Sequence, residues 1–176
     1  MASNIKQYLM GQRTKHAVGN ITSYNAPELF INGATVTEVG GVDNYTMVEL
    51  AYVEGAPTVK YATAGAKATN VFLVATPEVV LDKTHGEKLC DFYNAKGELA
   101  TLVYFKKGLS FETSAIDVST VVAGDFVTWD AATKKFVKAA SLAGTEIVAF
   151  QVTSKEVDER YLIDDMDVVE LTVIKC

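Results

Sequence analysis

The sequence predicts an all-β protein, a small barrel or sandwich with an extended N-terminal arm and at most one short helix. Three observations lead to this class. From residue 28 onward, clusters of Gly, Pro, Asn and Asp recur roughly every 8 to 12 residues, the spacing of turns in sandwiches and barrels. Between these clusters lie short runs of β-branched and aromatic residues. Stretches with helical periodicity are scarce.

The first clear strands are expected over 45–53 and 70–76. In YTMVELAYV, Met47 begins a set of alternate residues on one face, while Val48 and Leu50 lie on the other. The segment NVFLVAT is almost wholly apolar. This pattern is typical of a strand that is buried on both faces.

Two hairpins follow. Residues 88–111, KLCDFYNAKGELATLVYFKKGLSF, predict two strands joined through the turn at 94–97, whose glycine can adopt a positive φ. Residues 121–140, VVAGDFVTWDAATKKFVKAA, predict a turn, a strand, a polar loop and a returning strand.

The second hairpin carries specific turn chemistry. Gly124 can supply the unusual φ of the turn, and Asp125 can accept hydrogen bonds from nearby amides. Trp129 is the single tryptophan, and its large apolar ring is expected in the core.

The chain is expected to end with strands at 145–154 and 167–175. Between them, SKEVDERYLIDDMD (154–167) is the best candidate for a helix, with Ser154 as its cap. An acidic loop is the alternative for this segment.

Residues 1–27 differ from the rest. They are polar and carry a net charge of +3 with no acidic residue, whereas 28–176 carry −9. We expect 1–27 to be an arm that orders against a partner; the alternative is that it packs across its own domain. Residues 28–176 are expected to form one β domain, or two lobes divided near residue 105. The residues expected to make the partner contact are Lys6, Tyr8, Leu9, Arg13, Lys15 and Tyr24.

The composition argues against several classes of protein. Phosphate binding needs a basic surface, so the acidic body argues against nucleic acid as a ligand. No apolar run approaches the roughly 20 residues of a membrane-spanning helix. The N-terminus lacks the apolar core of a secretory signal. We therefore expect no membrane contact, and a chain made and kept in a cytoplasm.

One cluster could carry chemistry, DKTHGEKLCD (82–91), where His85 and Cys90 lie five residues apart. A metal site would need a closed ligand set, and a buried free cysteine is commoner than a Cys-His nucleophile. The sequence also has no phosphate-binding glycine motif and no hydrolase or metalloprotease signature. We therefore expect no catalytic residues, no metal, no cofactor and no enzymatic activity. Whether Cys90 and Cys176 are free stays open.

The stretch VVAGDFVTWDAATKKFVKAASLAGTEIVAFQVTS (121–154), followed by DVVELTVI, resembles the small capsid decoration (cement) proteins of tailed bacteriophages. In that family a Gly-Asp turn leads into an aromatic-rich strand, a polar hairpin with a lysine-rich return, and a strand like EIVAFQV. The resemblance covers about residues 106–176, and residues 28–105 exceed what a minimal decoration domain requires. It implies a non-enzymatic β domain that binds the outside of a capsid, often as trimers.

Three functional hypotheses follow. The first is a virion structural protein on the capsid surface, which binds the major capsid protein, associates with itself and uses residues 1–27 for attachment. The second is a head-fibre base or a tail component, which copy number per particle would distinguish. The third is a small ligand-binding β-barrel, or an enzyme that uses His85 and Cys90.

Overall fold

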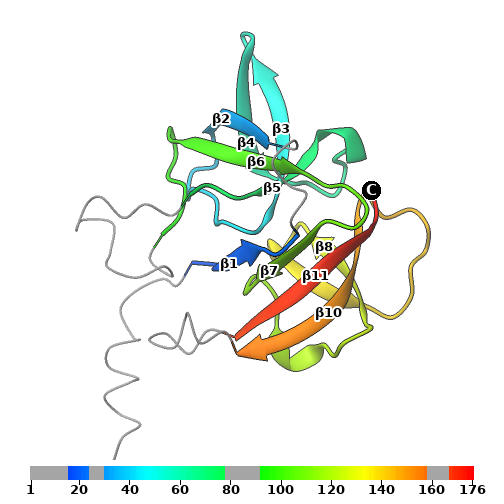
Figure 1. The fold of residues 1–176 in the computed structure, drawn as a ribbon. Coiled ribbons are helices and arrows are strands. Elements are labelled where there is room, and N and C mark those ends of the chain that lie inside the picture. Colours follow the sequence, from blue (N-terminus) through cyan, green and yellow to red (C-terminus); the bar gives the residue numbers. More distant parts are fainter. Residues whose placement is uncertain (1–15, 24–29, 78–91, 158–166) are drawn as a thin grey trace, which may run out of the picture.

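The computed structural model describes residues 16–23, 30–77, 92–157 and 167–176, and this part of the chain is all-β, as expected (Figure 1). No α-helix occurs among these residues. Their helical content is two short 3-10 turns, η2 (Ala68–Asn70) and η5 (Val118–Thr120). The eleven strands are divided between a closed barrel and a six-stranded sheet.

Five strands close the barrel in the order β2-β4-β3-β5-β6. β2 and β4 are parallel, and the other pairs are antiparallel. A β-bulge in β2 between Asn32 and Ala34 allows the strand to bend. Buried side chains such as Phe72 and Leu102 fill the interior, so the barrel is a packed core. The strands are β2 (Phe30–Val36), β3 (Met47–Val53), β4 (Ala56–Tyr61), β5 (Val71–Val74) and β6 (Leu99–Tyr104).

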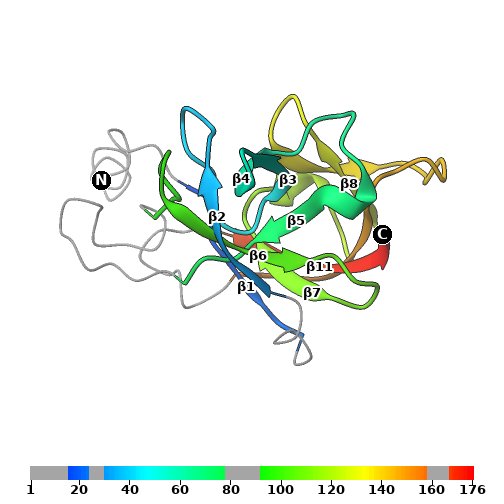
Figure 2. The same cartoon turned by 90° about the horizontal axis from the view of Figure 1, so that it is seen from above.

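The second layer is an antiparallel sheet in the order β1-β7-β11-β10-β8-β9. The sheet curls and brings the edge strand β9 back toward the end of β7. There the N–H of Phe136 in β9 donates to the carbonyl of Ala115, just after β7, at 2.8 Å. From above, barrel strands β5 and β6 lie over β7 and β11 (Figure 2). The strands are β1 (Gly19–Ile21), β7 (Ser110–Thr113), β8 (Phe126–Asp130), β9 (Lys135–Ala139), β10 (Ala149–Val157) and β11 (Asp167–Lys175).

The protein has two hydrophobic core clusters, one inside the barrel and one between the barrel and the sheet, and β5 contributes to both. Side chains alternate along β5, so Phe72 and Val74 pack inside the barrel while Val71 and Leu73 pack toward the sheet. All four are buried, which confirms the expectation of a strand buried on both faces.

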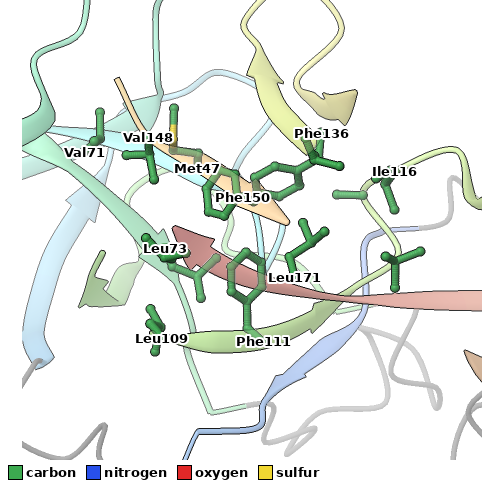
Figure 3. Close-up of a cluster of buried hydrophobic side chains, with 14 of the residues drawn as sticks. Met47, Val71, Leu73, Leu109, Phe111, Ile116, Phe136, Val148, Phe150 and Leu171 are labelled. Atoms are coloured by element: carbon green, nitrogen blue, oxygen red, sulfur yellow. The ribbon is translucent and has the colours of Figure 1, made fainter. Parts of the chain in front are cut away.

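On the sheet side, the core is built around three phenylalanine rings. Phe111, Phe136 and Phe150 lie with ring centroids 5.1–5.8 Å apart in tilted and edge-to-face arrangements. Leu171 packs in the same cluster (Figure 3). Edge-to-face pairs add to the stabilisation that burial of the rings provides.

The predicted hairpin at 121–140 is confirmed as β8 and β9. Gly124 has φ +92°, and the Asp125 carboxylate accepts a hydrogen bond from the amide of Val122 at 2.9 Å. Trp129 packs against the core but is only half-buried. Its indole N–H donates to the carbonyl of Ala62 at 3.0 Å, which joins the sheet to the barrel.

The helix considered for 154–167 is wrong where the structure describes the chain. Residues 154–157 continue β10, and Asp167 begins β11; residues 158–166 lie outside the described part. The pairing of Lys155 with Val169 is part of a ladder that extends to Val157 and Asp167. These cross-strand hydrogen bonds override the local helix propensity. The strand at 167–175 is confirmed.

The expectation of two strands joined through the turn at 94–97 is only partly confirmed, because a strand follows the turn but no strand directly precedes it among the described residues. β6 follows the turn, but on the other side Asn94, the first residue of the turn, forms only an isolated bridge with Val42. The Asn94 side chain donates to the Val42 carbonyl and to Oδ1 of Asn44. Residues 78–91 lie outside the described part.

Part of the N-terminal segment lies against the β domain. Ala17 and Val18 are buried, and β1 pairs with β7 from Gly19 to Ile21. Residues 16–23 therefore follow the alternative in which the segment packs across its own domain. Residues 1–15 and 24–29 lie outside the described part.

Candidate functional site

The residues predicted to contact a partner all lie outside the described part of the chain. These are Lys6, Tyr8, Leu9, Arg13, Lys15 and Tyr24. His85 and Cys90, the pair considered for chemistry, also lie outside it. The structure therefore does not place these residues relative to one another. Cys176 is described, and it is an exposed free thiol.

The described chain begins at an anchored histidine. Nδ1 of His16 lies 2.6 Å from Oδ1 of Asp43, and its ring stacks on Tyr93 with centroids 4.4 Å apart. The amide of Ala17 donates to Oδ2 of Asp43 at 3.3 Å. His16 is thus held against the loop before β3.

Asp43 also belongs to a network that extends toward β8. Its amide donates to the hydroxyl of Tyr61 at 2.9 Å. Burial raises the pKa of Tyr61, and the negative charge of Asp43 raises it further, so this hydroxyl stays protonated. The Tyr61 ring stacks on Trp129 with centroids 6.2 Å apart, and Nζ of Lys134 lies 4.6 Å from its centre.

The contacts described for this network anchor the N-terminal segment to the β domain. A histidine paired with a carboxylate is two thirds of a catalytic triad, whose third member is a nucleophile at the other ring nitrogen. Among the described residues, the contacts of His16 are the Asp43 carboxylate and the Tyr93 ring. The described residues also contain no group of three His, Cys, Asp or Glu side chains that could hold a metal ion.

The first surface feature suited to binding is the tip of the β3–β4 hairpin, which we define as residues 51–56. It projects beyond the rest of the barrel (Figure 1). Glu54 and Gly55 have φ of +52° and +83°, the conformation of a two-residue type I′ turn. All six residues are exposed, and the exposed fractions of Tyr52 and Val53 are 68% and 57%.

The second feature is a groove of about 500 Å³ between the barrel and β8, which we call the β8 groove. It forms because β8 pairs with β10 only at Phe126 and Val127. Beyond that point, residues 145–148 diverge from β8 and leave a gap. The groove is lined by the barrel residues Met47, Thr63 and Ala64, by 128–132 of β8 and its turn, and by Ala139, Ser141 and 145–148.

Small side chains and one aromatic ring form much of the groove wall, and two carboxylates lie in it. Asp130 accepts hydrogen bonds from the Thr133 hydroxyl and the Ala132 amide, and these contacts lower its pKa. Glu146 accepts from main-chain amides, its own among them, which lowers its pKa. Both groups are therefore charged at neutral pH, and their local hydrogen bonds hold the two turns in place.

Sequence reasoning missed both features. The Glu54-Gly55 turn, flanked by strand-forming residues, was a signal for a tight hairpin, but sequence does not show how far a hairpin projects. The groove had no signal, because its walls combine Met47 and residues 63–64 with residues between 128 and 148, which are distant from them in the chain. None of the described residues forms a helix long and apolar enough to cross a membrane.

Two comparisons with known proteins point to the same kind of source. The family model described as YonC prophage protein matches residues 12–174, and so covers both the barrel and the sheet. The chain is also 33% identical over 136 residues to a Bacillus subtilis (strain 168) protein named SPbeta prophage-derived uncharacterized protein YonC. That alignment covers 72% of this chain and 73% of the relative.

Proposed function

We propose that this chain, which belongs to the YonC prophage protein family, is a non-enzymatic structural protein of the phage particle that decorates the outer surface of the capsid. One observation carries this proposal: the β3–β4 hairpin projects from a packed β domain and exposes Tyr52 and Val53 at its tip. Exposed aromatic and apolar side chains on a projecting element favour contact with another protein.

The packed interior of the barrel supports a structural role. Val48, Phe72 and Leu102 lie inside it and are at most 2% exposed. A five-stranded barrel filled in this way provides a stable support for a projecting hairpin.

The proposed partners are the major capsid protein and further copies of this chain, on the surface of the virion. Residues 1–15 carry the basic residues Lys6, Arg13 and Lys15 and are followed directly in the chain by the anchored His16. A basic segment on an acidic body favours contact with an acidic surface. In this proposal, residues 1–15 hold the protein on the capsid.

The experiment that tests this function is induction of the prophage that encodes the chain, followed by density-gradient purification of the particles. Quantitative mass spectrometry then gives copies of this chain relative to the major capsid protein. Comparable copy numbers are expected for a decoration protein. A few copies per particle would instead identify a head-fibre base or a tail component. Absence from every particle would reject a virion role.

A second candidate function is the binding of a small ligand, favoured by the β8 groove. Its volume is within the range of ligand sites, and Trp129 lines it. Because the barrel interior is packed, such a ligand would bind in the groove. Quenching of Trp129 fluorescence by a compound, abolished by Ala132→Leu as a groove-filling variant, would support this function.

The enzyme hypothesis is tested through Cys90. In a structural protein, Cys90→Ala changes stability by about 1 kcal/mol and removes no activity. Loss of a measurable activity with the fold intact would instead support an enzyme that uses His85 and Cys90.

A further inference from the structure

We propose that the β8 groove binds a neutral carbohydrate, with a sugar ring lying on Trp129 and its hydroxyl groups hydrogen-bonded to Asp130. This inference rests on the second candidate function, ligand binding in the groove, and deepens it by naming the class of ligand. A role in the virion neither requires it nor excludes it.

Trp129 gives the groove a fixed apolar surface. Its indole N–H donates to the carbonyl of Ala62 at 3.0 Å, and its ring stacks on Tyr61 and meets Phe136 edge-to-face at 5.2 Å. Because the N–H is already used, the part of the ring that lines the groove offers carbon surface. The C–H groups on one face of a sugar ring pack against such a surface. Since the indole is already held, little side-chain entropy is lost on binding.

Asp130, next in the strand, supplies hydrogen-bond acceptors. A carboxylate has about four acceptor sites. One oxygen of Asp130 accepts from the amide of Ala132 at 3.0 Å and the other from the hydroxyl of Thr133 at 2.7 Å, so each oxygen can accept once more. Hydrogen bonds from a hydroxyl to an ionised carboxylate are short and strong. The sugar hydroxyls can therefore bind where their ring lies on Trp129.

The charges around the groove favour an uncharged ligand. Asp130 and Glu146 line it, and each has a lysine nearby. Nζ of Lys175 lies 3.5 Å from Oε2 of Glu146. Lys135 lies directly across the β8–β9 ladder from Asp130. These lysines offset much of the attraction that the carboxylates would exert on an amine, while the carboxylates themselves disfavour an anion.

Hydroxyl groups add further polar contacts. Thr128, Ser141 and Thr145 line the groove, and their hydroxyl groups form no hydrogen bond with other residues of the described chain. A hydroxyl can both donate and accept. A wall of carboxylate and hydroxyl oxygens suits a ligand with many O–H groups. A peptide backbone offers one N–H donor per residue and matches this wall less well.

The shape of the groove suits a chain of sugars. Its volume of about 500 Å³ is within the range of ligand sites. Ala64 and Ala132 in its lining are short and exposed, so the groove is open to solvent beside them. A bound chain can therefore continue beyond the site. A free oligosaccharide and the end of a surface polysaccharide present the same chemistry here.

The test follows Trp129 fluorescence in the full-length chain, where it is the single tryptophan. The chain is titrated with neutral oligosaccharides of glucose, galactose and N-acetylglucosamine, and with spermidine and an alanine tripeptide as an amine and a peptide. A saturable change with at least one neutral saccharide is expected. Polysaccharides of the same sugars coupled to beads are tested in parallel, and retention on the beads without binding of free oligosaccharides would identify a surface polysaccharide as the ligand.

Variants locate the binding in the groove. Asp130→Asn should weaken saccharide binding in calorimetry about tenfold or more, because it replaces a charged acceptor by a neutral one. Ala132→Leu should abolish binding by filling the groove. Asp117→Asn is the matched control, since Asp117 also accepts from an amide and a hydroxyl, both of Ser119, but does not line the groove. It should leave binding unchanged, and all three variants should keep the circular dichroism of the wild type.

Two results would overturn the proposal at the level of the site: saccharide binding that withstands Ala132→Leu, or equal losses from Asp117→Asn and Asp130→Asn. Binding of spermidine or the tripeptide in the groove, with no neutral saccharide bound, would refute the ligand class and leave ligand binding itself standing. No response of Trp129 to any of these compounds, and no retention on the beads, would reject both.

Discussion

At the scale of single residues, Gly19 fixes how closely β1 approaches its neighbours. A Cβ at this position would lie 2.0 Å from the carbonyl oxygen of Glu112 and 2.7 Å from Cγ of Tyr45. Contacts this short do not occur between these atoms, so any side chain would push β1 away from β7. Glycine is therefore required here by space.

The first prediction is that Gly19→Ala lowers the free energy of unfolding by about 2 kcal/mol, the cost of forcing a methyl group into a packed site. Urea denaturation followed by circular dichroism measures this change. Gly65→Ala is the matched control, since a Cβ there meets nothing within 4 Å. Equal stability changes for the two variants would show that β1 can shift without cost.

A second residue-scale prediction concerns Asp125. The Lys138 side chain, with Nζ 2.6 Å from Oδ2, and the Val122 amide lower the pKa of this carboxyl. The folded-state pKa is thus below the unfolded value of about 4. The contacts of the ionised Asp125 carboxylate therefore stabilise the fold fully above about pH 4. This stabilisation is lost as the pH falls through the folded-state pKa of Asp125.

Asp125→Asn should accordingly lower the melting temperature at pH 7, and the difference from wild type should shrink as pH falls below about 4. Calorimetry over a pH series measures both effects. Lys138→Gln should reproduce the same pH dependence. A difference that stays constant down to acidic pH would mean that the ion pair does not contribute.

At the scale of elements, the segments that sequence predicted well are those whose signal is local. The apolar run of β5, the Gly124-Asp125 turn and the strand at 167–175 all carry their pattern within a few residues. The helix considered for 154–167 failed because pairing with β11 decided the conformation of its first residues. The candidate site could not be predicted, since the β8 groove exists only where distant segments meet.

The N-terminal segment gives the element-scale prediction. His16 is held by Asp43, Val18 is buried and β1 pairs with β7, so the β domain includes these residues. Removal of residues 1–15 should leave the free energy of unfolding unchanged. Removal of residues 1–22 should lower it by about 2 kcal/mol or more, because Val18 and the β1 ladder are lost.

Thermal unfolding compares the two truncations, and co-sedimentation with particles that lack this chain tests their binding. Under the proposed function, removal of residues 1–15 abolishes binding while the fold persists. Full binding by this truncated chain would show that another surface, such as the hairpin tip, makes the capsid contact.

At the scale of the whole molecule, the barrel and the sheet are joined by side chains that belong to one cluster. Leu73 and Val103 of the barrel strands pack in the same cluster as Phe150 and Leu171 of the sheet. The hydrogen bond from Trp129 to Ala62 adds a polar link between the two layers. If either layer unfolded, the other layer would expose the apolar side chains that it now buries and would lose the stabilisation from that burial.

The last prediction is that the β domain unfolds in one cooperative transition. Leu73→Ala, in the barrel, should destabilise the protein by about 2–5 kcal/mol because it leaves a cavity in the shared core. It should shift the fluorescence transition of Trp129, in the sheet, as far as the transition seen by circular dichroism. Leu99→Ala, at an exposed position of β6, should shift neither transition.

Calorimetry gives an independent test of cooperativity, because the measured enthalpy should equal the van't Hoff value. Two separated transitions, with Trp129 insensitive to Leu73→Ala, would mean that the barrel and the sheet unfold independently, and that the hairpin tip can move relative to the groove edge of the sheet.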